Sequence, residues 1–586
     1  MFGNFLYFII VLLIYSTYQP PEKSNFTDVE TLFLFFLLFF LFYVITRHLF
    51  KNLEKQLLVQ NTPQLVHRFE SLITRQSIMA VTFFSINIYC LSLPTFFIDI
   101  PVLKSIPTLT ALIFVSLFLV YLSIIWFHAY GCHSHLNDPS ISRKNYIHSN
   151  ISVSVPVILP WFFLSGISDI IFLLPLKFPK EVLATPFGQA VYFLFFLIVA
   201  AITAPIIIQK FWGCIPLAPG IHRTQIEAFC KKADVQFADI LRWPLFGGRM
   251  ITAGVMGLVK RFRYILVTPA LLQFLDPQEL DAVMAHEIGH VKKKHLLFYL
   301  VFFAGYMLIS FAGFDLLILI LVYIEPLVVF LASSGLHQES VSSIFISIFL
   351  ILFFILYFRF FFGYFMRNFE RQADIYVYEL LDSAKPLISS LNKIAIISGQ
   401  PSDKPNWHHF SISERIDYLK KCEVNQTWIH KHHRKVRNSI TLFLVGMVLV
   451  SAAAYDLNFG STGKKLNLHL FETMMMKNCE SIIAAYEKSL SEKPESPEIL
   501  NNLSWIYATS NKIECQDRKK ALALALKAVE RKKEAYILDT LAEAYFVNGL
   551  IEEAISAEKQ ALSLAKEDER DIYEKQLIKF QNAIAR

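Results

Sequence analysis

The stretch from Ala282 to His295 reads AVMAHEIGHVKKKH and contains the pattern H-E-x-x-H. On a helix, residues four apart lie on one face, so the imidazoles of His286 and His290 can hold one zinc ion from the same side. Glu287 lies beside them and can take a proton from a zinc-bound water and later pass it to a leaving amine. The alternative is a solvated helix face with idle histidines.

A second motif lies further along the chain, where the stretch from Arg367 to Asp374 reads RNFERQAD. Glu370 and Asp374 are again four residues apart, so both can point at one site. A site with two histidines needs a third ligand, which Glu370 can supply. Asp374 can accept a hydrogen bond from the second nitrogen of a metal-bound histidine and so fix its tautomer. Taken alone, the two acids are better explained as solvated residues of a surface helix.

Long apolar runs set the fold class. Of 586 residues, 54% are apolar, 18% are charged and 55 are Phe, a composition that is unusual for a soluble domain. A bilayer span needs about 20 apolar residues. Such runs lie at about 4–18, 31–50, 78–98, 108–128, 151–176, 186–209, 296–324, 343–366 and 438–455. We therefore predict an α-helical polytopic membrane protein with nine spans, the first of which is retained because no basic start or cleavage site marks a signal peptide.

Basic segments orient these spans, because loops rich in Lys and Arg stay in the cytoplasm. Four such segments fall on one side if the N-terminus is inside: 47–75, 143–144, 210 and 430–437. Residues 211–295 and 367–437 are then cytoplasmic, and the chain after Tyr455 is outside. Only Lys104, Lys177 and Lys180 argue against this orientation. The short loops and the charged tail suggest a bacterial inner-membrane protein.

The number of spans between the two motifs decides whether their side chains can meet. His290 precedes the run 296–324, and Glu370 follows the run 343–366. Two spans form a hairpin that returns the chain to the same face, so the ligands can meet at one leaflet surface. An odd number of spans would separate them, and Asp315, which interrupts the first run, is the weakest point of this count.

The soluble segments are predicted to contain short helices and a small β element. A helix is expected at Arg223–Ala233, followed by β-like runs between 249 and 268 and a short helix after Pro269. Asp276 begins the next helix as its N-cap, since Pro277 and Glu279 follow at the favoured positions. The predicted division is 1–212 (six spans), 213–295 (zinc helix), 296–366 (membrane hairpin), 367–437 (third ligand), 438–456 (last span) and 457–586 (tail).

The tail after residue 457 is charged and rich in Ala and Leu. Residues 500–528 and 538–561 repeat one pattern, with large residues on a first helix and small residues on a second. The pattern resembles the tetratricopeptide repeat (TPR), an α-solenoid that binds partner proteins, although an ordinary helical bundle is the alternative. Cys479 and Cys515 are the only cysteines of the tail and could form a disulfide if it is outside.

Together the motifs resemble the M48 group of integral-membrane zinc endopeptidases, which includes the CAAX prenyl protease and a bacterial heat-shock protease. The resemblance covers about 215–420. It rests on the stretch His286–His290, on E-x-x-A-D from Glu370, and on residues 409–416, where HFSISERI resembles the group's H-P-[S/T]-x-x-x-R segment. Phe410 departs from the usual proline. The resemblance implies a zincin-like domain, one zinc ion per chain and peptide-bond hydrolysis.

The resemblance also implies roles for individual residues. Glu287 is the expected base, and Glu370 the third zinc ligand. His409 is expected near the substrate, where it can stabilise the oxyanion, unless it is an ordinary loop histidine. Arg415, in the same segment, is expected with Asp374 around the ligands.

The stretch Thr252-Ala253-Gly254-Val-Met-Gly257 resembles the strand before the zinc helix, with Thr252 where Asn is common. Peptides often bind proteases by adding a strand to an exposed edge. This stretch is therefore either a substrate-binding strand or a buried core strand, and the sequence leaves both open.

A membrane zinc endopeptidase is the preferred functional hypothesis. It would cleave membrane or membrane-associated proteins at the cytoplasmic face, surrounded by lipid, with a partner protein on the repeat tail. The alternative is a TPR scaffold or sensor on a membrane anchor, with a regulatory or inactive protease domain. An intramembrane zinc protease is disfavoured because charged residues flank the motif. Nucleic-acid binding is not supported, because the basic residues lie at the ends of apolar runs and form no stripe.

Five further polar residues lie in or near the predicted spans. His430, His432 and His433 lie among Lys and Arg residues and are better explained as a basic anchor next to the last span than as a metal site. Asp169 and Asp315 lie in or near spans, where an acid either lines a functional chamber or marks a loop end.

Overall fold

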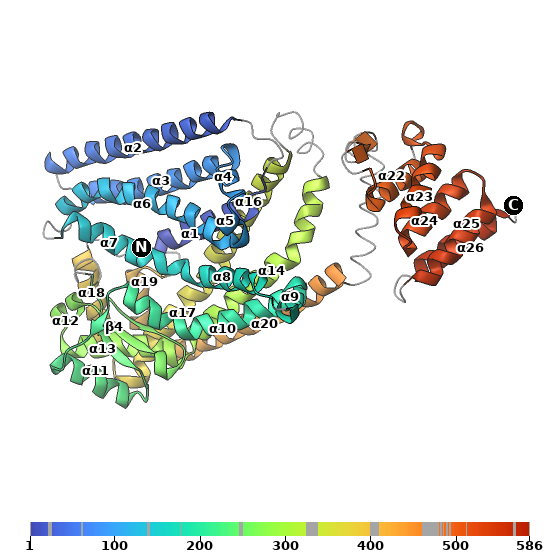
Figure 1. Ribbon diagram of the computed structural model, residues 1–586. Coiled ribbons are helices and arrows are strands. Elements are labelled where there is room, and N and C mark those ends of the chain that lie inside the picture. The colour runs from blue at the N-terminus through green and yellow to red at the C-terminus, as the bar shows by residue number, and fades with distance from the viewer. Residues whose placement is uncertain are drawn as a thin grey trace. The chain divides into compact units, whose positions relative to one another are not determined.

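The fold is described from a computed structural model of the chain (Figure 1). The structure describes residues 2–20, 26–59, 63–136, 141–175, 177–244, 250–323, 338–398, 403, 409–459, 494–510, 512–565 and 570–584, with isolated positions between 480 and 491. The chain forms two compact units, one of Met1–Phe311 with Val329–Ser451 and one of Ala312–Val328 with Ala452–Arg586.

Phenylalanine fills the core of the first helices. Four helices enclose this core: α1 (Phe2–Thr17), α2 (Asp28–Val59), α3 (Pro63–Ser85) and α6 (Pro107–Leu136). Phe8, Phe42 and Phe118 are fully buried there, whereas Phe33 and Phe36 on the outer side of α2 are 67% and 63% exposed. A broad exposed apolar surface is unfavourable in water. In a bilayer it faces lipid, and the helix satisfies its own backbone hydrogen bonds.

Among the described residues, five helices are long and apolar enough to cross a membrane: Asp28–Val59, Pro107–Leu136, Phe187–Phe211, Ile344–Leu380 and Thr427–Leu457. A sixth span results if the pair α7 (Arg143–Ser154) and α8 (Leu159–Leu173), bent by 58°, is one span. A polytopic helical membrane protein is thereby confirmed. Two of the remaining predicted spans correspond to shorter apolar helices in the described part of the chain, Leu6–Thr17 and His295–Ser310.

The predicted span 78–98 is not a single helix. α3 ends at Ser85 and continues as a π-helix, η1 (Ile86–Cys90), and the short helices α4 (Thr95–Ile98) and α5 (Pro101–Ser105) follow. Pro94 and Pro101 lack a backbone N–H, which disrupts regular helix. Asn87 is fully buried and donates a hydrogen bond to the hydroxyl of Tyr121 (3.0 Å). The run is therefore apolar because part of it fills the core of this unit, which hydropathy alone does not distinguish from a span.

A small sheet and five helices form the soluble part of the first unit. The strands are β1 (Ile215–Pro216), β2 (Asp239–Arg242), β3 (Ala253–Met256) and β4 (Tyr264–Val267), and their order is β1-β2-β4-β3. β2 and β4 are parallel, and the other two pairs are antiparallel. The helices are α11 (Ile221–Lys232), α12 (Pro269–Phe274), α13 (Pro277–Lys292), α18 (Lys385–Ser398) and α19 (Ile412–Val424). The predicted helix at 223–233, the β element and the helix after Pro269 are confirmed.

The two ends of the predicted membrane hairpin lie together. α14 (His295–Tyr323) leads away from α13, and α16 (Gln338–Leu356), the π-helix η5 (Tyr357–Phe362) and α17 (Gly363–Leu380) lead back, so that α17 contacts α13. Residues 324–337 and the side chain of Asp315 lie outside the described residues. Phe302, Phe365, Phe369 and Val436 form one cluster that joins α14 and α17 to α20 (Thr427–Phe459).

Helix pairs form the second unit. α22 (Pro497–Thr509) packs against α23 (Arg518–Arg531) and α24 (Ala535–Val547) against α25 (Ile551–Leu564), followed by α26 (Arg570–Ile584). Small residues at these contacts, such as Ala528 and Ala561, are fully buried. The paired helices are found as expected, while their identity as a TPR stays a prediction. Cys515 is disulfide-bonded, and its predicted partner Cys479 lies outside the described residues.

Candidate active site

α13 is anchored at its start and presents two imidazoles on one face. The predicted capping box is present, and the backbone N–H of Asp276 donates to Glu279 (2.9 Å). Glu279 is buried and also accepts a hydrogen bond from Lys393 of α18 (2.7 Å). Further along the helix, the Nε2 atoms of His286 and His290 lie 3.4 Å apart.

Glu370 of α17 lies opposite the two histidines. One of its carboxylate oxygens is 3.5 Å from His286 Nε2, and the other is 3.5 Å from His290 Nε2. The side chains of His286 and Glu370 are each 10% exposed, and that of His290 is 13% exposed. Residues that lie 80 and more positions apart in the sequence therefore converge on one small volume.

Close contact between the backbones of α13 and α17 makes this convergence possible. A Cβ atom on Gly289 would lie 2.9 Å from Cβ of Tyr376 and 3.1 Å from Cα of Ala373. Those distances are too short for any side chain to be added without a shift of one helix. Gly289, inside the H-E-x-x-H pattern, therefore sets the spacing between the helix of the histidines and the helix of Glu370.

The three side chains fit a metal ion. One ligand atom from each of His286, His290 and Glu370 lies within 4.8 Å of the other two. Tetrahedral zinc with bonds of about 2.0–2.2 Å places its ligand atoms about 3.3–3.6 Å apart. The separation of 3.4 Å between the two Nε2 atoms agrees with that geometry, and each of these nitrogens lies 3.5 Å from a different oxygen of Glu370. Two imidazoles and one carboxylate are also a donor set that zinc accepts.

Asp374 and Arg415 lie behind His286. The Nδ1 atom of His286 is 2.9 Å from Asp374, and the Arg415 guanidinium donates two hydrogen bonds to the same carboxylate at 2.9 and 2.7 Å. Burial alone would lower the pKa of His286, but the carboxylates of Asp374 and Glu370 outweigh it and raise the pKa to about 10. With Nδ1 held by Asp374, Nε2 is the nitrogen directed at Glu370 and His290.

His409 reaches the same site from the loop before α19. Its Nδ1 atom lies 3.0 Å from Glu370. The next residue, Phe410, stacks on the guanidinium of Arg371, which lies 3.7 Å from the ring centroid, and Tyr418 of α19 covers the guanidinium at 4.4 Å. This cation–π stack fixes the loop beside α17. Phe410, where the M48 group usually has proline, thus has an anchoring contact of its own.

Glu287 is half-buried on α13, directly after His286. Its charge interacts with the imidazole of His290 and with the guanidinium of Arg415. A carboxylate in that position is near enough to the ligand cluster to exchange protons with a group bound there.

β3 is an edge strand of the sheet, because β4 is its single strand neighbour among the described residues. The carbonyl of Thr252 accepts a hydrogen bond from the N–H of Thr268 (3.2 Å). Hydrogen-bonded pairs alternate in antiparallel sheets, so Gly254 also directs its backbone groups toward β4. The peptide groups of Ala253 and Val255 then point away from β4, toward the free edge.

Gly257 ends this strand in a conformation that other residues rarely adopt. Its φ angle is +110°, and an added Cβ would clash with the carbonyl of Phe262. The glycine therefore permits the sharp turn between β3 and β4. Its role is in shaping the edge strand.

A comparison with known families decides the class of enzyme. Residues 223–423 match the model of Peptidase family M48. The chain contains an M48 peptidase domain. Together with the membrane helices, this makes it an integral-membrane metalloendopeptidase. The match agrees closely with the expected range of about 215–420.

The crystal structure of Ste24p from S. mikatae is similar with a TM-score of 0.40 and 18% sequence identity, covering 71% of this chain and 95% of that one. No curated protein gives a significant sequence match.

Four other polar residues near the predicted spans, His430, His432, His433 and Asp169, are not members of this cluster. Within the described residues, His430, His432 and His433 form no metal-binding group. His430 is exposed, whereas His432 is buried and its Nε2 bonds the carbonyl of Asn368 (2.9 Å). Asp169 accepts a hydrogen bond from the backbone N–H of Thr108 (2.8 Å), the second residue of α6. It therefore caps the start of α6. This role accounts for an acid near a span, so no functional chamber is needed to explain it.

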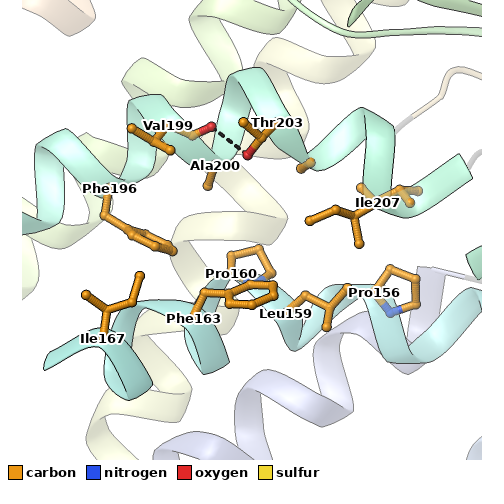
Figure 2. Close-up of a pocket in the computed structure, with 12 residues that line it drawn as sticks. Pro156, Leu159, Pro160, Phe163, Ile167, Phe196, Val199, Ala200, Thr203 and Ile207 are labelled. Atoms are coloured by element: carbon orange, nitrogen blue, oxygen red, sulfur yellow. Dashed lines mark hydrogen bonds between the residues drawn. The ribbon is translucent and has the colours of Figure 1, made fainter. Parts of the chain in front are cut away.

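An apolar cavity of about 230 Å³ lies away from the M48 site, between α8 and α10 (Pro186–Phe211) (Figure 2). Pro160, Phe163, Phe196 and Ile207 are among the residues that line it. Thr203 is its one hydroxyl, and that hydroxyl donates to the carbonyl of Val199 (2.9 Å). Since no lining residue titrates, this cavity cannot perform the acid–base chemistry of peptide hydrolysis.

Three residues of the site were not assigned a role from the sequence. Gly289 lies between the two histidines in the sequence, and a small residue where two helices meet is the usual signal of close helix contact. His295 and Gln372 lie beside His290. Their separation of 77 positions leaves no local pattern by which sequence reasoning could connect them.

Proposed function

We propose that this chain is a zinc endopeptidase that cleaves membrane or membrane-associated proteins at the cytoplasmic face of a bacterial inner membrane. The observation that carries the proposal is the cluster of His286, His290 and Glu370, with Glu287 beside it. One zinc ion per chain would be held by these three side chains. The donor set and the ligand separations both support zinc.

In this proposal a bound zinc ion supplies Lewis-acid chemistry, since it polarises the scissile carbonyl and acidifies water. The chain's own residues do the rest. Glu287 accepts the proton of the attacking water on its carboxylate and donates it to the leaving amine. His409, held next to Glu370 by the Phe410 loop, donates a hydrogen bond to the carbonyl oxygen as negative charge develops there. Asp374 and Arg415 keep the ring of His286 in place.

We propose that the substrate binds in an extended conformation along β3. The outward peptide groups of Ala253 and Val255 support this, because they can pair with a substrate backbone while the side chains of β3 still pack on the sheet. Backbone pairing depends little on substrate sequence. The enzyme would therefore accept unfolded or loosely folded segments of many proteins near the membrane.

The orientation of the chain is part of the proposal. The basic segments support an M48 domain in the cytoplasm and a TPR-like tail outside, where the tail would bind a partner protein. A disulfide at Cys515 supports an oxidising compartment for the tail. Protease accessibility of a C-terminal tag in intact spheroplasts tests this directly, and a tag cleaved only after lysis would contradict it.

The function is tested with purified full-length protein in detergent. We expect about one zinc per chain and cleavage of a quenched-fluorescence peptide library. Glu287→Gln should keep the zinc and lose activity by about 100- to 10,000-fold, because it removes the general base alone. His286→Ala should lose both. Zinc-loaded wild type without cleavage would contradict the proposal, and a cellular role preserved in Glu287→Gln would favour a TPR scaffold.

A further inference from the structure

The two histidines of the cluster are held by different partners. The second nitrogen of His286 meets a carboxylate, whereas Nδ1 of His290 lies 3.0 Å from Nδ1 of His295. His295 is the first residue of α14 and is fully buried. Its ring stacks on that of Phe369 at 4.4 Å, with 6° between the ring planes. The ring is therefore fixed in position by packing as well as by hydrogen bonds.

A chain of hydrogen bonds continues from His295 to α20. Nε2 of His295 lies 3.0 Å from the side-chain oxygen of Gln372 on α17, and the side-chain nitrogen of Gln372 lies 2.8 Å from Nδ1 of His433 on α20. Gln372 is buried, and His433 is half-buried near the start of its helix. His290 is thus connected through three further side chains to a helix that is long and apolar enough to span the membrane.

The amide of Gln372 fixes the proton positions along this chain. An amide oxygen only accepts and an amide nitrogen only donates, so Nε2 of His295 carries a proton and donates it to Gln372. A fully buried imidazole without an acidic partner remains neutral, so Nδ1 of His295 has a free lone pair. It accepts from Nδ1–H of His290, which leaves the lone pair of His290 on Nε2, facing Glu370 and His286.

The opposite orientation of the Gln372 amide would put the proton of His290 on its other nitrogen. If the nitrogen of Gln372 faced His295, each proton along the chain would move to the other nitrogen, and Nε2 of His290 would carry a proton. A protonated Nε2 cannot bind a metal ion. The structure has the first arrangement, with the amide oxygen of Gln372 facing His295 and its nitrogen facing Nδ1 of His433.

We propose that His295 and Gln372 are positioning residues, which hold His290 in the tautomer and ring orientation that binds metal. Asp374 and Arg415 hold the ring of His286 through charged groups. His295 and Gln372 hold the ring of His290 through neutral groups. This inference rests on the proposed function, since it concerns the affinity of the same site for zinc. The competing explanation is that His295 and Gln372 only fill space in the core.

Substitutions that preserve packing separate the two explanations. His295→Phe keeps an aromatic ring against Phe369 and removes both nitrogens. Gln372→Leu roughly keeps the volume of the side chain and removes its polar atoms, while Gln372→Glu keeps an acceptor for Nε2–H of His295. His432→Phe is a matched control, because His432 is an equally buried histidine outside the chain of hydrogen bonds.

Zinc affinity of the full chain in detergent, measured by competition with a chromophoric chelator, is the primary readout. His295→Phe and Gln372→Leu should each weaken zinc binding by about 10- to 100-fold. Gln372→Glu should recover most of the affinity, and His432→Phe should leave it unchanged. The absorption bands of the cobalt-substituted protein should shift in His295→Phe but not in His432→Phe, since they report ligand geometry.

Thermal unfolding of the metal-free proteins is measured alongside. Wild-type zinc affinity in both His295→Phe and Gln372→Leu would overturn the proposal. A loss of affinity in Gln372→Glu as large as in Gln372→Leu would overturn it too, because a retained acceptor would then make no difference. If His295→Phe does not fold, the comparison between the two Gln372 variants decides. A wild type that binds no zinc would contradict the proposed function itself.

Discussion

Gly289 is the residue on which the geometry of the site depends most directly, because it permits the contact between α13 and α17. Gly289→Ala adds a Cβ that would meet Tyr376 at 2.9 Å and Ala373 at 3.1 Å. The two helices must move apart, and Glu370 moves away from the histidines. We expect a destabilisation of about 1–3 kcal/mol, the usual cost of overpacking, and weaker zinc binding. Thermal unfolding and chelator competition measure the two effects.

The same substitution elsewhere gives the control. Gly446 lies in the helix α20, and an added Cβ there meets nothing within 4 Å. Gly446→Ala should therefore be neutral or stabilise the helix by up to about 1 kcal/mol. If Gly289→Ala behaves like Gly446→Ala in both measurements, the close contact does not determine the site.

At the scale of helices and strands, the elements that could be predicted are those marked by residues close together in the sequence. The start of α13 follows from Asp276, Pro277 and Glu279, and its two histidines follow from their spacing. Glu370 could be placed opposite them because two spans return the chain to one face. The broken run 78–98 could not be predicted, because a buried core segment and a span have the same hydropathy. His295 and Gln372 were also beyond prediction, since their contact depends on how α14 and α17 pack.

β3 gives a prediction that belongs to a strand as a whole. If a substrate pairs with the free edge, every second substrate peptide group bonds Ala253 or Val255, because backbone groups alternate along a strand. N-methylation of one substrate nitrogen at a time should raise KM at alternate positions and leave the positions between them almost unchanged. Steady-state kinetics on such a peptide series measure this. Each unaffected position serves as the control for its neighbour.

The protein itself can be tested in the same way. Val255→Pro removes an outward N–H without removing a hydrogen bond to β4 and should impair the same substrate positions. A KM that rises equally at all N-methylated positions would show that substrate does not pair with β3. An unchanged KM across the whole series would show the same.

On the scale of the whole molecule, the second unit, hereafter the repeat unit, has a stability that depends on pH through two carboxyls. Asp539 of α24 and Glu558 of α25 are two carboxyls with buried oxygens, and their charges interact. Burial raises the pKa of both, and the negative charge of Asp539 raises that of Glu558 further. At neutral pH the folded unit therefore retains protons that the unfolded chain has released.

The sign of the pH effect follows from this difference. The free energy of unfolding decreases with rising pH wherever the folded state binds more protons. Unfolded carboxyls release their protons near pH 4, so the repeat unit should lose stability steadily as the pH rises above that value toward the raised pKa values. Hydrogen exchange of peptides from 535–564 in the full chain, corrected for intrinsic rates, should show less protection at pH 8.5 than at pH 6.

Two matched substitutions on α25 separate this pair from general charge effects. Glu558→Gln keeps the volume of the fully buried side chain but cannot ionise, so the loss of protection between pH 6 and pH 8.5 should become smaller. Glu552→Gln changes an exposed acid on the same helix and should leave the loss unchanged. Protection that is constant or rises with pH in the wild type would mean that the pair does not store a proton, and the repeat unit would then contribute no pH dependence of this kind to the enzyme.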